Sequence, residues 1–271
     1  MRSALYVPGN RPDLFDKALA GPADVILLDL EDAVPVRDKD SARAEVVAWL
    51  RSVPATRRIW VRVNPGETGA ADLRAVAATA VEAVCLAKTE SAQQVRAASA
   101  LLAEGEARPG TIRICPLLES AAALYAAREI ASAPRVLRLQ LGEADLRAEL
   151  GITPSPDDRE LLALRGQVVL ASAAAGIAPP LGPASTDFRD LDALRESTRA
   201  LQRSGFRGRS CVHPAQVPVV NEVCTPSANE VARARALVAR FEAAAGGVLL
   251  DEAGRMVDLA VVRQARRLLD E

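Results

Sequence analysis

The sequence predicts an α/β protein built as a (β/α)8 barrel with a C-terminal helical extension. Short apolar or β-branched runs recur every 20 to 40 residues, and stretches with helical periodicity separate them. Several runs are continuously apolar rather than alternating, which is typical of parallel strands that are covered on both faces. Eight such β–α units favour a barrel over a doubly wound sheet.

The expected strands are Ser3 to Val7, Asp24 to Leu30, Arg58 to Asn64, Ala83 to Lys88, Thr111 to Leu118, Val136 to Leu141, Ile177 to Leu181 and Ser210 to His213. The seventh segment is the least favourable as a strand, because Pro179 and Pro180 have no N–H to donate to a neighbouring strand. Between the strands, Ser91 and Gln94 have the spacing of a capping box and predict the start of a helix.

The pattern changes after the eighth strand. A long helix capped by Ser227 and Glu230 is followed by Gly246-Gly247, a short Val248 to Leu250 run and a final helix from about Leu259. We therefore expect a barrel over residues 1–220 and a helical extension over residues 221–271 that acts as a lid.

Composition limits the possible partners. The 271 residues are 49% apolar and carry a net charge of -1, with charges of both signs spread along the chain, so no basic face proposes nucleic acid. No apolar run approaches the roughly 18 residues that a membrane-spanning helix needs. The four cysteines lie in apolar runs without paired C-x-x-C spacing, which indicates buried reduced thiols and a cytoplasmic protein. A small-molecule partner is the expectation.

Polar residues at the ends of the apolar runs are the candidate site, because the active site of such a barrel lies at the C-terminal ends of its strands. They are Asn10 and Arg11, Asp29, Glu31 and Asp32, Arg62 and Asn64, Lys88, Glu119, Gly142 to Asp145, and His213. Carboxylates and cations that converge from separate strands require a function or strong pairing.

Glu119 and Asp145 are the candidate metal ligands. Two carboxylates from different strands, without histidine or cysteine nearby in sequence, suit a hard cation such as Mg²⁺, with waters and substrate completing the coordination. The alternative is that each merely caps the helix that follows its strand.

Arg62 alternates with apolar residues in its strand and can point inward at a substrate carboxylate or oxyanion, which a guanidinium fork suits. The alternative is a salt bridge to Glu31 or Asp32, and both can hold at once.

The single histidine and one lysine leave further alternatives open. His213 ends the eighth strand and is either a hydrogen-bonded structural group or a base. Lys88 ends the fourth strand and either forms a salt bridge or, when desolvated, a Schiff base with a carbonyl substrate.

Eight motifs in order resemble the citrate lyase beta subunit and the malyl-CoA/citramalyl-CoA lyases of the HpcH/HpaI aldolase superfamily. They are L-Y-V-P-G-N-R-P (5–12), L-D-L-E-D-A-V (28–34), V-R-V-N (61–64), L-A-K-T-E-S (86–91), L-L-E-S (117–120), G-E-A-D-L (142–146), C-V-H-P-A-Q (211–216) and M-V-D (256–258). Together they cover nearly the whole chain.

The resemblance implies a homotrimeric barrel in which Glu119 and Asp145 hold Mg²⁺, Arg62 contacts the oxo acid, and Asp258 enters a neighbouring subunit's active site as a catalytic residue. It further implies substrate binding by Glu31, Asp32, Gly142 and Ala144, and coenzyme A binding by Arg11 and His213. One departure stands out, since relatives commonly have a polar or acidic residue where this chain has Ala144. That departure bears on the hydrogen bonds around the metal and hence on which oxo acid fits.

The activity implied is Mg²⁺-dependent cleavage of a 3-hydroxyacyl thioester of the citryl-, citramalyl- or malyl-CoA type into acetyl-CoA and a 2-oxo acid. Two alternatives stay open: a beta subunit that depends on an acyl carrier protein within a citrate lyase complex, and a Schiff-base aldolase that uses Lys88. The choice of oxo acid depends on pocket volume and is not fixed by sequence.

Overall fold

The computed structural model describes residues 1–54, 58–244, 249–250 and 254–269. The chain divides into two compact units, Met1–Glu222 and Val223–Glu271, and each has an apolar cluster of its own. The expected turn at Gly246-Gly247 and the start of the following run at Val248 lie outside the described residues.

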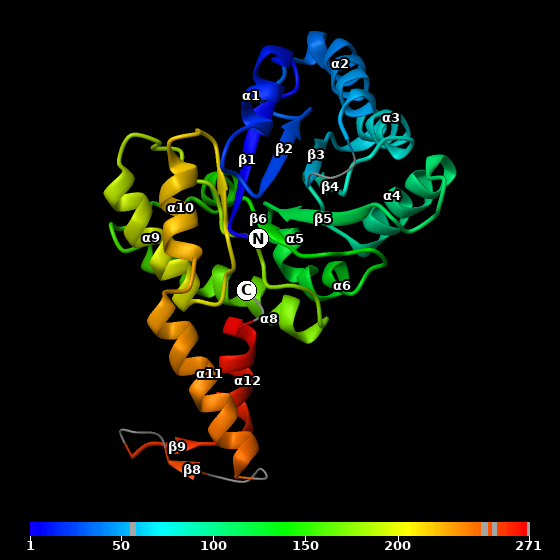
Figure 1. Ribbon diagram of the computed structural model, residues 1–271. Helices are drawn as coiled ribbons and strands as arrows, with labels where there is room; N and C mark the ends of the chain where they lie inside the picture. Colours follow the sequence, from blue (N-terminus) through cyan, green and yellow to red (C-terminus); the bar gives the residue numbers. More distant parts are fainter. Residues whose placement is uncertain (55–57, 245–248, 251–253, 270–271) are drawn as a thin grey trace. The chain divides into compact units, whose positions relative to one another are not determined.

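The first unit is built on a parallel sheet. Its strands are β1 (Ser3–Pro8), β2 (Val25–Asp29), β3 (Ile59–Val63), β4 (Ala83–Leu86), β5 (Arg113–Leu118), β6 (Gln140–Leu141) and β7 (Arg209–Cys211). They pair in the order β6-β5-β4-β3-β2-β1-β7, and Figure 1 shows the helices on the outside of this sheet. Seven of the predicted strands are present, although the sixth is shortened to two residues.

The predicted strand Ile177 to Leu181 is wrong as stated, because this described segment forms no strand. The two prolines that precede Leu181 have no N–H to donate. What remains are isolated parallel bridges, from Leu181 to Gln140 of β6 and from Gly182 to Arg209 of β7. One short segment therefore contacts both edge strands of the sheet.

Apolar side chains fill the inner side of the sheet. The buried cluster contains Val25, Leu27, Trp60, Cys85, Cys115, Leu117 and Leu181, all at most 5% exposed. All four cysteines are buried thiols, as the sequence predicts. Because this interior is filled, the polar residues gather at the ends of the strands.

The helices of the first unit follow the strands in alternation. They are α1 (Phe15–Leu19), α2 (Lys39–Ser52), α3 (Gly66–Ala77), α4 (Ala92–Gly105), α5 (Ala121–Tyr125), α6 (Ala127–Ala131), α7 (Glu143–Leu150), α8 (Leu162–Ala174), α9 (Leu191–Arg203) and α10 (Gln216–Cys224), with 3-10 turns η1 (Pro12–Leu14), η2 (Val36–Asp38) and η3 (Arg159–Leu161). The predicted capping box at Ser91 and Gln94 opens α4. Among the described residues, we find no helix with the length and apolar character that crossing a membrane demands.

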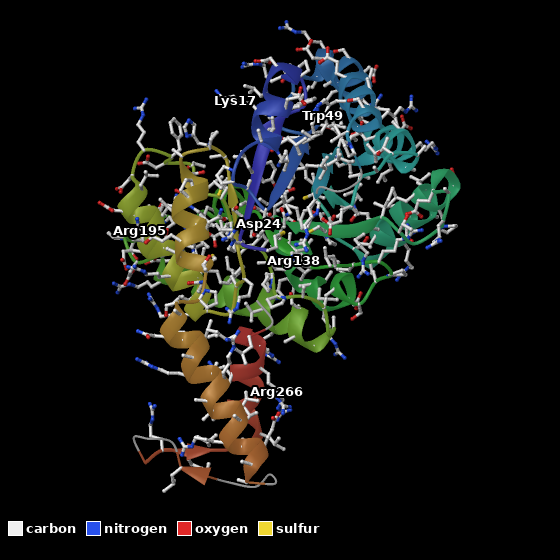
Figure 2. The ribbon with its side chains drawn as sticks, in the orientation of Figure 1. Lys17, Asp24, Trp49, Arg138, Arg195 and Arg266 are labelled. Atoms are coloured by element: carbon white, nitrogen blue, oxygen red, sulfur yellow. The ribbon has the colours of Figure 1, made fainter. Side chains whose placement is uncertain are left out.

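The second unit contains α11 (Ala228–Ala243), a hairpin of β8 (Leu249–Leu250) and β9 (Met256–Val257), and α12 (Leu259–Leu269). Ser227 and Glu230 form the predicted capping box of α11. Phe241, Val257 and Val262 make its buried cluster. An ion pair of 2.8 Å from Arg266, labelled in Figure 2, to Glu242 adds a polar link between α12 and α11.

Candidate active site

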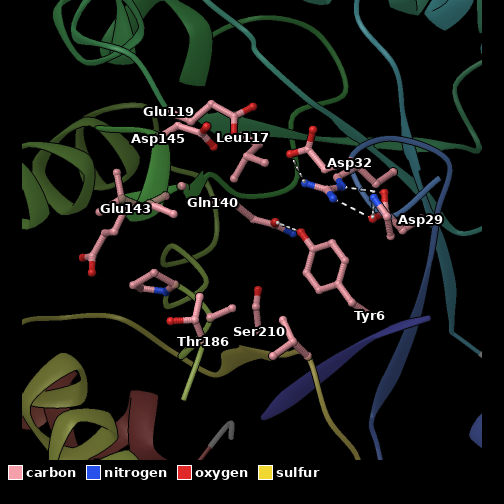
Figure 3. Close-up of a pocket in the computed structure, with 18 of the residues that line it drawn as sticks. Tyr6, Asp29, Asp32, Leu117, Glu119, Gln140, Glu143, Asp145, Thr186 and Ser210 are labelled. Atoms are coloured by element: carbon pink, nitrogen blue, oxygen red, sulfur yellow. Dashed lines mark hydrogen bonds and ion pairs between the residues drawn. The ribbon is translucent and has the colours of Figure 1, made fainter. Parts of the chain in front are cut away.

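A cavity of about 450 Å³ lies at the carboxyl ends of the strands of the first unit. Figure 3 shows its lining, which includes the predicted site residues Asp32, Arg62, Glu119, Gly142, Ala144 and Asp145. It also includes Asp29 and Glu143, which the sequence places at strand ends, and Tyr6, Gln140 and Ser210, to which the sequence interpretation gave no role. The fold thus brings residues from strands far apart in sequence to one cavity.

Glu119 and Asp145 lie beside each other on one wall of this cavity (Figure 3). Glu119 directly follows β5 and is 5% exposed, whereas Asp145 is in the first turn of α7. Burial, helped by a hydrogen bond shared with the Asp145 carboxyl group, raises the pKa of Glu119 to about 7 against the opposing effect of Lys88. A buried carboxylate beside a second carboxylate favours its neutral form unless a cation joins the two.

The backbone around Glu119 is shaped to hold its side chain. The N–H of Lys88 donates a hydrogen bond of 2.6 Å to Oε1, and Lys88 adopts a φ of 50°, which is uncommon for a residue other than glycine. On the opposite side, a Cβ at Gly142 would lie 2.6 Å from the Glu119 Cβ and 2.9 Å from Oε2. A glycine is therefore required where Glu119 packs against the start of α7.

The donor set fits Mg²⁺. Among the described residues, no group of three or more His, Cys, Asp or Glu side chains is arranged to hold a metal. A pair of carboxylates is what a magnesium ion commonly takes from a protein, with waters and substrate supplying the other oxygens. The raised pKa of Glu119 and the room left by Gly142 both fit a cation between the two carboxylates.

Arg62 is held by carboxylates on the neighbouring strand. Its Nε and NH2 atoms donate two hydrogen bonds of 2.6 Å each to Asp29, which is directly opposite in the β2–β3 register. Its NH1 lies 3.0 Å from Glu31 Oε2 and 3.9 Å from Asp32 Oδ2, and its guanidinium carbon lies 5.1 Å from the centre of the Tyr6 ring. Although burial lowers it, these contacts raise the pKa of Arg62 above its usual value. The guanidinium is thus charged, fixed and in the cavity wall.

Lys88 and Glu31 complete the charge pairing around Arg62. Lys88 Nζ lies 3.4 Å from Glu31 Oε1. Burial lowers the pKa of the Lys88 amine, but the charges of Glu119 and Glu31 outweigh this and raise it overall. A Schiff base requires a neutral amine, so this environment disfavours that chemistry. Glu31 itself is 3% exposed and is occupied by the two cations.

The loop that carries Glu31 is tied down from α2 and β3. Lys39 Nζ donates to the carbonyl oxygens of Leu30 and Glu31 at 2.8 and 2.6 Å. Asn64 Nδ2 donates to the same Leu30 oxygen at 2.8 Å and to the fully buried Asp72 at 2.7 Å. Lys39 and Asn64 therefore hold the backbone of this loop in place.

Glu143, the acid that precedes Ala144, pairs away from the carboxylate pair. Arg165 in α8 donates to its two oxygens at 2.6 and 2.9 Å and also to Asp158 at 2.9 Å. Arg165 is 5% exposed, so this network anchors the start of α7. Glu143 is therefore part of a structural ion pair.

The remaining predicted residues lie elsewhere. Arg11 is exposed and pairs with Asp13 at 2.7 Å, and His213 is exposed and stacks on Phe188 with ring centres 4.7 Å apart. Both are outside the cavity lining. Asp258 belongs to the second unit, where it accepts hydrogen bonds from the N–H groups of Ala260 and Val261 and caps α12.

The comparisons with known proteins agree with the site. The family model described as HpcH/HpaI aldolase/citrate lyase matches residues 2–214. The chain is 32% identical to the citrate lyase subunit beta of Leuconostoc mesenteroides subsp. cremoris, covering 99% of this chain and 92% of that protein. It is 33% identical to an L-malyl-CoA/beta-methylmalyl-CoA lyase of Cereibacter sphaeroides, covering 97% and 92%. It is also 34% identical to a (3S)-malyl-CoA thioesterase of Cereibacter sphaeroides, covering 99% and 93%.

The solved structures give the same family. CitE from Mycobacterium tuberculosis in complex with magnesium, acetoacetate and coenzyme A matches with a TM-score of 0.82 and 33% identity over 99% of this chain and 97% of that one. The fold, the site and these matches define an aldolase- or lyase-type α/β protein. The chain belongs to the HpcH/HpaI aldolase/citrate lyase family.

Proposed function

We propose that this protein is a Mg²⁺-dependent carbon–carbon lyase that cleaves a 3-hydroxyacyl thioester into acetyl-CoA and a 2-oxo acid. The observation that carries the proposal is the pair of Asp145 and the buried Glu119, whose pKa is raised, in the same cavity as a fixed Arg62. In this proposal the sheet and the Leu181–Gly182 bridges form a complete (β/α)8 barrel, and the buried thiols fit a cytoplasmic protein. Support also comes from the lyases among its relatives.

Different residues bind the metal, bind the substrate carboxylate and stabilise the negative charge that develops. Glu119 and Asp145 hold Mg²⁺, which when bound supplies Lewis-acid polarisation of the substrate hydroxyl and carboxylate. The N–H groups of Glu143 and Ala144 at the start of α7 receive the acid carboxylate, because the first N–H groups of a helix have no partner within it. The N–H of Gly142 donates to the carbonyl oxygen of Leu118 at 2.8 Å, so Gly142 contributes to substrate binding through the room that its missing Cβ leaves. Arg62 stabilises the negative charge on the oxygen that becomes the ketone of the oxo acid.

Bond cleavage runs as a retro-Claisen step. The hydroxyl proton passes to solvent water, the C–O bond becomes a carbonyl, the adjacent C–C bond breaks, and its electrons leave as the thioester enolate of acetyl-CoA. Asp258 of a neighbouring subunit in a homotrimer protonates that enolate carbon, with residues 221–271 acting as the lid. Arg11 and His213 bind the phosphates of coenzyme A at the mouth, and Asp32 contributes to substrate binding from the cavity wall.

Asp258 offers a test that separates its two roles. Asp258→Asn should retain the cap of α12, because asparagine caps helices about as well as aspartate, while it removes the proton donor. We expect turnover to fall about 10²- to 10⁴-fold with an unchanged melting temperature. Turnover close to that of the wild type would remove Asp258 from the mechanism.

A second candidate is a thioesterase, which the 34% identical malyl-CoA thioesterase favours. Purified protein is incubated with citramalyl-CoA, malyl-CoA and citryl-CoA, each with Mg²⁺ or with excess EDTA, and the products are quantified by mass spectrometry. The lyase releases acetyl-CoA and a 2-oxo acid, and the thioesterase releases free coenzyme A and the hydroxy acid. Mg²⁺-independent release, or none, contradicts the proposed lyase.

If none of the three thioesters reacts, two further tests follow. Copurification with an acyl carrier protein indicates a subunit of a citrate lyase complex, since the first relative is such a beta subunit. A covalent adduct at Lys88 after incubation with an oxo acid and borohydride indicates Schiff-base chemistry. The raised pKa of Lys88 predicts that no adduct forms near neutral pH.

A further inference from the structure

Gln140 is a buried polar residue of the cavity that the proposed mechanism leaves unused. It begins β6, is 2% exposed and lines the cavity. Its parallel partner on β5 is Leu117, two residues before Glu119. Since a strand advances about 3.3 Å per residue, Gln140 lies roughly 7 Å deeper along the strands than the proposed metal ligands.

One half of the Gln140 amide is satisfied and the other is not. Its Oε1 accepts a hydrogen bond from the Tyr6 hydroxyl at 3.2 Å and one from the Cys85 thiol at 3.5 Å, and Figure 3 shows the contact with Tyr6. Its Nε2 is buried and has no oxygen or nitrogen acceptor among the described residues. It approaches the thiol of Cys115, whose pKa burial raises against the lowering effect of a hydrogen bond from Gln140, but sulfur is only a weak acceptor. A buried N–H group without an acceptor is costly and rare, so a bound molecule is the natural source of one.

The orientation of the substrate decides which part of it reaches the Gln140 Nε2 atom, and that orientation rests on the proposed function. The thioester arm must leave through the cavity mouth, and the acid carboxylate is taken by the start of α7 and the metal. The group that points inward is therefore the substituent on the hydroxyl-bearing carbon. That substituent is hydrogen in a malyl thioester, methyl in a citramalyl thioester and a carboxymethyl group in a citryl thioester.

We propose that Gln140 is the specificity-determining residue and that its Nε2 donates a hydrogen bond to an oxygen of this substituent, which selects the citryl thioester and its product oxaloacetate. A methyl group or a hydrogen offers no acceptor and leaves the buried donor unpaired. Ser210 on β7 is 5% exposed and brings a hydroxyl to the same cavity. Sites built to hydrogen-bond a substrate group discriminate strongly against analogues that lack it.

The test compares kcat/KM for the three CoA thioesters at saturating Mg²⁺ in the wild type and in Gln140→Leu. The wild type should prefer the citryl thioester. The variant should lose about 10- to 100-fold on the citryl thioester, as expected for one hydrogen bond to a charged group, and change within about threefold on the other two. A wild type that prefers the citramalyl or malyl thioester, or equal losses on all three, overturns the proposal.

Two variants sharpen this test. Tyr6→Phe removes the hydroxyl that orients the amide and should reduce the citryl preference in the same direction by a smaller factor. Leu117→Met alters the neighbouring wall without a polar group, so it should change all three substrates by similar factors. Leu117→Met that lowers the citryl preference as much as Gln140→Leu does contradicts the assignment.

A binding measurement separates this proposal from the proposed function. Calorimetry with Mg²⁺-saturated protein compares oxaloacetate with pyruvate in the wild type and in Gln140→Leu. Tighter binding of oxaloacetate that the variant abolishes supports the Gln140 assignment even when no thioester is cleaved. Equal affinities for the two acids in the wild type overturn it even when a thioester is cleaved.

Discussion

Two groups of carboxylates lie at the same end of the sheet, but their charges are balanced in opposite ways. Asp29 and Glu31 are 2% and 3% exposed and are paired with the guanidinium of Arg62, while Lys88 also reaches Glu31. Glu119 is as buried, yet it meets the carboxyl group of Asp145 and the backbone N–H of Lys88. The first group is electrostatically complete and fixes Arg62. The second requires an added cation, which is why we assign the metal to it.

The largest expected effect comes from removing a charge of the incomplete pair. Glu119→Gln should lower turnover by about 10³-fold or more, since a metal that polarises the substrate contributes several kcal/mol to the transition state. The same change should raise the melting temperature of the metal-free protein at pH 8, because it removes the repulsion with Asp145. If the variant keeps both turnover and the wild-type melting temperature, the contrast between the two groups has no functional meaning.

The complete group should respond differently to the loss of its cation. Arg62→Ala should lower turnover about 10²- to 10³-fold and also destabilise the protein by about 3–5 kcal/mol, because Asp29 is left buried and unpaired. The double variant Arg62→Ala/Asp29→Asn is the control in urea denaturation and turnover assays. It should regain stability without regaining rate, and recovery of the rate would show that Arg62 acts only by pairing Asp29.

Filling the space beside Glu119 should have an intermediate effect, which is on the affinity for Mg²⁺. Gly142→Ala places a Cβ against the Glu119 side chain and should weaken Mg²⁺ binding about 10- to 100-fold. Gly166→Ala in α8 is the matched control, because its added Cβ meets no atom within 4 Å, and it should leave Mg²⁺ affinity unchanged. Equal Mg²⁺ affinities in the two variants, measured by calorimetry, argue against a metal held at Glu119.

The smallest effect is the pH dependence of the metal-free protein and of its metal affinity. The pKa of Glu119 is raised to about 7 from an ordinary value of 4.5, so the folded chain holds more protons than the unfolded chain between these values. Stability of the metal-free protein should therefore fall as pH rises from about 4.5 to 7. Mg²⁺ affinity should rise by up to about tenfold per pH unit below 7 and level off above it. A flat profile that Glu119→Gln does not alter contradicts this assignment.

The sequence predicted the site as far as strand ends can be recognised. Glu119, Asp145 and Arg62 each end an apolar run, and the barrel rule collects such residues at one edge. The predicted salt bridge of Arg62 to Glu31 is present, and Arg62 also lines the cavity, where its contact with a substrate stays a prediction. The alternative that Glu119 caps the following helix is wrong, because Ser120 is the N-cap of α5.

What the sequence could not supply was register and the orientation of side chains. Asp29 was visible at the end of a buried run, but its bidentate pairing with Arg62 follows from the β2–β3 register. Gln140 looks like an ordinary residue of a short strand until its buried, unsatisfied amide is seen. The predicted seventh strand does not form, because Pro179 and Pro180 have no N–H to donate, and only isolated bridges at Leu181 and Gly182 are present.

Calorimetric titration of Mg²⁺ into metal-free wild-type protein and into Glu119→Gln at pH 8 tests the central claim most directly. The account predicts one Mg²⁺ bound per chain in the wild type and no measurable binding to the variant under the same conditions. Equal binding to both proteins, or no binding to the wild type, would contradict the assignment of the metal to the Glu119–Asp145 pair.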